Sequence, residues 1–98
     1  MSHHLPVVLT EIRSLLDQPA DREPDSRAFV EKTLTDGYAH ALMLGGERLR
    51  VEDRLRTVVR APKRDESQLA ELTLALDELD RELAGLRGLL TALRAHAL

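Results

Sequence analysis

The chain has 98 residues, carries 17 Asp or Glu against 14 Lys or Arg for a net charge of −3, and contains no cysteine. This length allows one small domain, and the lack of cysteine excludes disulfides and cysteine-based zinc sites. No apolar run reaches the roughly 18 residues of a membrane span, and the start lacks the basic region of a signal peptide. We therefore expect a cytoplasmic protein without a membrane partner.

The composition favours helices. With one Phe, one Tyr and no Trp, the chain is poor in the aromatic residues that strands prefer. Apolar residues at i, i+3 and i+4 predict a first helix over 5–17, with Pro6 suited to its first turn. Residues 18–25 hold two prolines among charges and predict a linker. The fold class expected is all-α, within a single helical domain over 1–98.

Two long helices follow, over 26–60 and 66–96. Asp25 or Ser26 is expected to cap the first of them, and Pro62 to end it. Residues 61–65 form a turn, in which Asp65 caps the last helix. Leucines recur in that helix at alternating spacings of three and four residues, a coiled-coil pattern: Leu69, Leu72, Leu76, Leu79, Leu83, Leu86, Leu90 and Leu93.

The helix over 26–60 carries a matching row. Its members are Val30, Leu34, Gly37, Ala41, Leu44, Arg48, Val51, Leu55 and Val58. If the two helices fold back as an antiparallel hairpin, each facing pair of residue numbers sums to 127. We call these two rows the seam. Residues 47–64 carry an excess of basic residues and 65–82 an excess of acidic ones, which supports the same pairing because opposite charges flank the seam.

Gly45 and Gly46 lie in the middle of this helix. The seam keeps its phase across the pair, so we expect the helix to continue through both glycines, at a cost of about 1 kcal/mol each relative to alanine. A kink at the pair is the alternative.

Apolar residues remain outside the seam. The short first helix is expected to fold back and cover Phe29, Tyr38, Leu42 and Leu89. Surface left over predicts a homodimer in a helical bundle, or a partner protein. The predicted partner interface comprises Tyr38, Leu42, Gly45, Gly46, Leu49, Leu74 and Leu89.

Arg48 is the one charged residue in the seam. Glu78 and Glu82 flank the layer that faces it and are its expected partners. Arg48 then either fixes the register with its head group at the edge of the seam, or belongs to an anion site between the helices.

Other chemistry has little support. Asp36, His40 and Glu47 share a helical face, but a metal site needs three or four converging ligands, so we expect neither a metal nor a cofactor. The basic cluster over 48–64 lacks the aromatic residues that stack on bases and faces an acidic helix, which argues against nucleic acid as a partner. Neither an activated serine nor a phosphate-binding loop is recognisable, so we do not expect an enzyme.

Two functional hypotheses result. The first is a non-enzymatic interaction, adaptor or regulatory module that presents an apolar helical surface to a second copy or to a partner protein. The alternative is a ligand-gated regulator that binds a small, nucleotide-like anion between its helices through Arg48 and neighbouring arginines.

Overall fold

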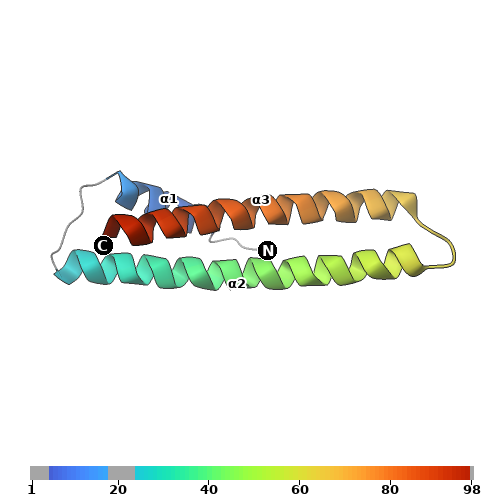
Figure 1. Ribbon diagram of the computed structural model, residues 1–98, viewed down its shortest axis with the longest axis horizontal. Helices are drawn as coiled ribbons and strands as arrows, with labels where there is room; N and C mark the ends of the chain where they lie inside the picture. Colours follow the sequence, from blue (N-terminus) through green and yellow to red (C-terminus); the bar gives the residue numbers. More distant parts are fainter. Residues whose placement is uncertain (1–4, 18–23, 98) are drawn as a thin grey trace.

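The computed structural model describes residues 5–17 and 24–97 and places three helices there: α1 (Leu5–Leu16), α2 (Pro24–Arg60) and α3 (Glu66–Ala97). The described residues contain no strand, so the all-α prediction is confirmed. The molecule is a rod of 61 × 21 × 18 Å. α2 and α3 lie side by side along it and run in opposite directions, with α1 beside them at the end opposite the 61–65 turn (Figure 1). We call the α1 end the base and the other end the tip.

The helix ends follow local chemistry. Pro6 lies in the first turn of α1, where a missing N–H is harmless. α2 ends at Arg60, two residues before Pro62. At the start of α3, Gln68 N donates to Asp65 Oδ1 at 3.0 Å, so Asp65 is the predicted cap.

The start of α2 differs from the prediction. The helix begins at Pro24, so Asp25 and Ser26 lie in its first turn and neither precedes it as a cap. Proline is well suited to the first helical position, because its fixed φ is helical and the N–H it lacks would have no partner there. Most of the predicted linker, residues 18–23, lies outside the described residues.

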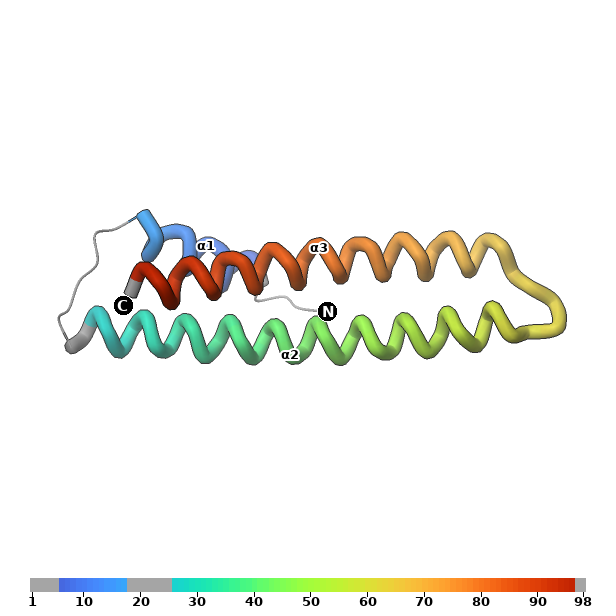
Figure 2. The backbone as a smooth tube through the Cα atoms, viewed as in Figure 1, coloured from blue at the N-terminus to red at the C-terminus, as the bar shows by residue number. Residues whose placement is uncertain are grey.

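α2 continues through Gly45 and Gly46 without interruption (Figure 2). Neither glycine has a positive φ, so both keep ordinary helical geometry. The predicted continuation is therefore confirmed. Side-chain packing on both sides of the pair holds the helix, which outweighs the low helix propensity of glycine.

Every seam residue whose burial the structure describes is buried or half-buried. One layer is especially close: a Cβ built on Gly37 would lie 3.3 Å from Leu90 Cγ and closer still to Leu90 Cδ2. Leucine fills the space that glycine leaves, and 37 and 90 are a pair that sums to 127. The two long helices are in van der Waals contact at this layer because one side chain is absent.

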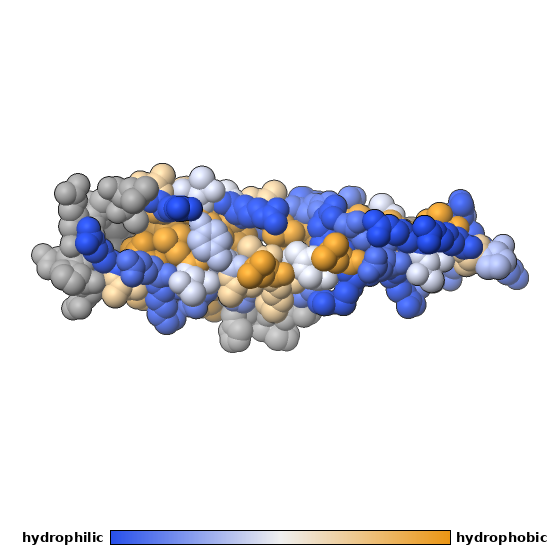
Figure 3. Space-filling model, turned by 60° about the horizontal axis from the view of Figure 1, so that its bottom comes forward, coloured by the Kyte–Doolittle hydropathy of each residue, from blue (hydrophilic) through white to orange (hydrophobic). Residues whose placement is uncertain are grey.

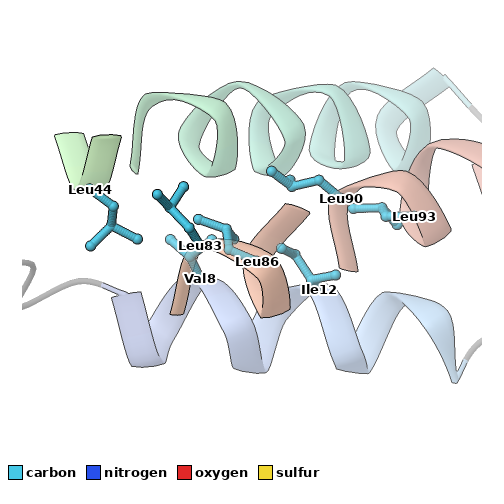
Figure 4. Packing of buried hydrophobic residues seen from close by; sticks show 7 residues of the cluster. All are labelled: Val8, Ile12, Leu44, Leu83, Leu86, Leu90 and Leu93. Atoms are coloured by element: carbon cyan, nitrogen blue, oxygen red, sulfur yellow. The ribbon is translucent and has the colours of Figure 1, made fainter. Parts of the chain in front are cut away.

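The core is concentrated at the base. Val8 and Ile12 of α1 point toward leucines of α3 (Figure 4). Burying each such side chain fully contributes about 1.5–3 kcal/mol. Near the tip Val58, which is 8% exposed, is the one buried residue among the described apolar residues, because two helices alone can shield only a narrow strip. The buried cluster consists of Val8, Ile12, Leu44, Leu83, Leu86, Leu90 and Leu93.

α1 does not cover the residues expected of it. Phe29, Tyr38 and Leu42 are exposed, so that prediction is wrong for these three. Leu89 is half-buried against the core cluster, which includes Val8 and Ile12 of α1. α2 is instead buried or half-buried along its flank at Ser26, Thr33 and His40, spaced by seven residues, with Thr33 only 2% exposed. Both flanks of α2 carry contact candidates. α1 packs against both α2 and α3, and the burial of Thr33 indicates that α1 docks on the flank that contains this residue.

No helix in the described parts of the chain combines the length and the hydropathy needed to cross a membrane.

Two glycine substitutions test the packing of α2 on α3. Alanine at Gly37 must displace Leu90, which is 1% exposed, and overpacking costs about 1–3 kcal/mol. Alanine at Gly85, where a Cβ meets nothing within 4 Å, gains about 1 kcal/mol of helix propensity. In urea denaturation we expect Gly85→Ala to raise the free energy of unfolding and Gly37→Ala to lower it. Equal stabilisation by both would contradict the close approach at Gly37.

Candidate functional site

An apolar row runs along the outside of α2. Tyr38, Leu42 and Leu49 are 44%, 80% and 62% exposed, and with Gly45 they are spaced by four, three and four residues. Such spacing places all four on one helical face. We call Tyr38, Leu42, Gly45 and Leu49 the α2 stripe. Figure 3, in which α2 comes forward, shows hydrophobic surface in the middle of the molecule and mostly hydrophilic surface toward the tip.

The packing of α1 explains why the α2 stripe is exposed. Successive residues of a helix turn by about 100°, so Leu42 lies about 180° around α2 from Thr33, nine positions earlier. Thr33 is 2% exposed, and this burial assigns its flank to α1. The α2 stripe therefore faces away from α1, and the seam, which lies between these two flanks, faces α3.

The glycines leave a gap in this face. A Cβ built on Gly45 would meet nothing within 4 Å, and one on Gly46 would meet only Arg50 Nη1 at 3.8 Å. The gap lies between the two exposed leucines of the α2 stripe. It differs from Gly37, whose missing side chain is replaced by Leu90.

The other predicted interface residues do not join this face. Leu74 is 62% exposed but belongs to α3. It is five residues from each of the seam leucines Leu69 and Leu79, a spacing that places it on a different side of α3 from the seam. Leu89 is half-buried against the core. Val59, which is 46% exposed, lies 14 residues, or two heptads, after Gly45 and so continues the line of the α2 stripe toward the tip. It was not among the predicted interface residues, although its spacing from Gly45 could have identified it.

Arg48 contacts acidic residues other than those expected. Its Nε donates to Asp80 of α3 and its Nη1 to Glu52, whereas Glu78 and Glu82 were predicted. Asp80 directly follows Leu79, the seam residue that faces Arg48, and therefore flanks this layer. Glu52 lies four residues after Arg48, a spacing that brings side chains together on a helix; this signal was present in the sequence.

The contacts of Arg48 belong to a surface network. Its side chain is 36% exposed, and Glu52 also accepts from Arg56 Nη2 at 3.4 Å. Asp53 accepts from Arg56 Nη1 at 3.3 Å. Because carboxylates already surround Arg48, an incoming anion would have to displace them. The anion hypothesis stays a prediction, and this pairing does not favour it.

The other described residues show no metal-binding group, but they include an ion pair on α2 and a shallow hollow near the tip. No group of three or more His, Asp or Glu among the described residues is arranged to hold a metal. Lys32 Nζ donates to Asp36 Oδ2 at 2.9 Å, and this bond raises the pKa of Lys32 above its usual 10.5. Near the tip, a shallow hollow of mixed charge is lined by Asp53, Arg56, Thr57, Arg60 and Ala61.

Comparisons of this chain with protein-family models, with curated proteins and with solved structures find no match.

Replacing Arg48 by leucine tests the weight of its ion pairs. Partly exposed pairs contribute about 0–1 kcal/mol, and leucine would extend the apolar seam. We expect Arg48→Leu to keep or raise the free energy of unfolding in urea denaturation, by up to about 1 kcal/mol. The control is Arg50→Leu, at an exposed position outside the seam, where no gain is expected. A loss of more than about 2 kcal/mol for Arg48→Leu would show that its ion pairs hold the helices together.

Proposed function

We propose that this protein is a non-enzymatic interaction module, with an adaptor or regulatory role, that buries the α2 stripe against a second copy or a partner protein. The observation that carries the proposal is the exposure of Leu42 and Leu49, 80% and 62%, on a helix whose adjacent face is packed against α3. The protein would then act through binding alone, by altering the protein to which it is bound.

Single exposed leucines are ordinary on protein surfaces. The α2 stripe differs from a scattered set because its spacing of four, three and four residues is also the spacing of the seam. A second row of this kind suits another helix laid along α2, with the side chains of the row as anchors. α1 does not supply that helix, because it docks on the opposite flank.

The proposed architecture follows from these contacts. α2 and α3 form an antiparallel, coiled-coil-like hairpin, α1 braces its base, and the bound helix completes a helical bundle. Apolar burial supplies affinity, and the charges beside the α2 stripe select register and orientation.

A pair of substitutions on the α2 stripe tests this function. Leu42→Glu with Leu49→Glu puts two charges on the α2 stripe, whereas Leu74→Glu puts one on a leucine of α3 that is as exposed as Leu49. Both changes are at exposed positions and keep a good helix former, so each should cost the isolated chain little stability. The measurements are sedimentation velocity of purified protein and co-purification from the native cell.

We expect the wild type and Leu74→Glu to be found in an assembly, and the α2 stripe variant to be found alone. Two results would overturn the proposal: a wild-type chain that remains a monomer and co-purifies with nothing, or an assembly that the α2 stripe variant leaves intact.

A further inference from the structure

We infer that the occupant of the α2 stripe is α2 of a second copy, antiparallel to the first and related to it by a two-fold axis beside Met43 and Leu44. This inference rests on the proposed function and names its partner. The α2 stripe belongs to a longer row on one face of α2, in which residues are spaced alternately by three and four. The row consists of Ala28, Glu31, Thr35, Tyr38, Leu42, Gly45, Leu49, Glu52, Arg56 and Val59.

Contacts within the chain supply the packing rule. In the seam, Leu90 occupies the space left by Gly37, so a large side chain faces a missing one. The α2 stripe contains the same two components, an exposed leucine and an open glycine, three positions apart at Leu42 and Gly45. Within one chain they cannot meet, because both lie on the same helix face. Two antiparallel copies bring them together twice.

The pairing then follows from helix geometry. In an antiparallel pair the facing residue numbers have a constant sum, which is 87 when Leu42 faces Gly45 of the second copy. In this register Tyr38 faces Leu49 of the second copy. All four residues of the α2 stripe thus face one another, and two-fold symmetry repeats each contact.

Neighbouring registers fail. A shift of one heptad in one direction, to a sum of 94, sets Leu42 against Glu52 of the second copy. The opposite shift, to a sum of 80, sets Leu49 against Glu31 of the second copy. Each of these shifts buries a carboxylate against a leucine. That costs free energy even for Glu52, which pairs with Arg48 and Arg56 of its own chain, because removing an ion pair from water carries a desolvation penalty. The register with a sum of 87 is the one of the three that keeps apolar residues together.

Charge favours the same orientation. At a sum of 87, Glu31 faces Arg56 of the second copy at both ends of the apolar region, and both residues are exposed in the single chain. A parallel pair would instead set each Glu31, Glu52 and Arg56 against its own counterpart, and like charges in contact disfavour that arrangement. Beyond the charged pairs, Ala28 faces Val59 of the second copy.

Cysteine cross-linking tests the inference, because the natural chain has no cysteine. Ala28 and Val59 are exposed and lie outside the α2 stripe. We expect the Ala28→Cys, Val59→Cys double variant to form a covalent dimer with a short bis-maleimide. Within one chain its two thiols are 31 residues apart, or about 46 Å at 1.5 Å per residue, so the link must join two copies.

The single variants are the controls. Ala28→Cys alone and Val59→Cys alone should not cross-link, since identical positions lie far apart in an antiparallel dimer, whereas an equal mixture of the two should. Adding Leu42→Glu and Leu49→Glu to the double variant should abolish the dimer.

The contradicting outcomes are distinct. Cross-linking of each single variant to itself would mean a parallel pair and would overturn the inference. A second outcome is that no variant cross-links, while another protein co-purifies with the wild type and is lost from the Leu42→Glu, Leu49→Glu chain. This outcome would overturn the inference and leave the proposed function standing. No cross-link and no assembly of any kind would overturn both.

Discussion

The packing of α3 leucines against α2 is the contact on which the rest of the structure depends. Leu83, Leu86, Leu90 and Leu93 are buried at the base, and they fix the rotation of α2 about its own axis. α1 buries Val8 and Ile12 against these leucines on one flank of α2, and the opposite flank of α2 is turned to solvent. The exposed α2 stripe is thus a consequence of how the core is built.

Glycine has two different roles on the same helix. At Gly37 the missing side chain is required within the chain, because Leu90 fills its place. At Gly45 nothing within the chain fills the space, although a glycine inside a helix costs about 1 kcal/mol relative to alanine. The open position lies between two exposed leucines, and this combination is what links the architecture to the proposed association.

The spacing of leucines and the positions of prolines were sufficient to predict the all-α class and the uninterrupted course of α2 through Gly45 and Gly46. The flank on which α1 docks was predicted wrongly, because both flanks of α2 offer contacts and a short connection does not select between them; the buried Thr33 carries no hydrophobic signal. The partners of Arg48 were also mistaken. Several carboxylates lie within reach of its long side chain, and which of them it contacts depends on side-chain conformation, which residue spacing does not specify.

The most direct test of this account is a distance between α2 and α3 near the base. Spin labels at Thr35→Cys and Ala92→Cys, both exposed, mark a pair whose numbers sum to 127; labelled protein would be diluted with unlabelled chains and measured by double electron–electron resonance. Antiparallel packing of α3 on α2 should give one narrow, short distance, because packed helix axes lie about 8–10 Å apart. Thr35 is about 38 Å along α2 from Arg60, at 1.5 Å per residue, so a bend in α2 or a separation of α2 from α3 would move the two labels far apart. A broad distribution extending to tens of ångströms would mean that α2 bends at the glycine pair or leaves α3, and would contradict the account.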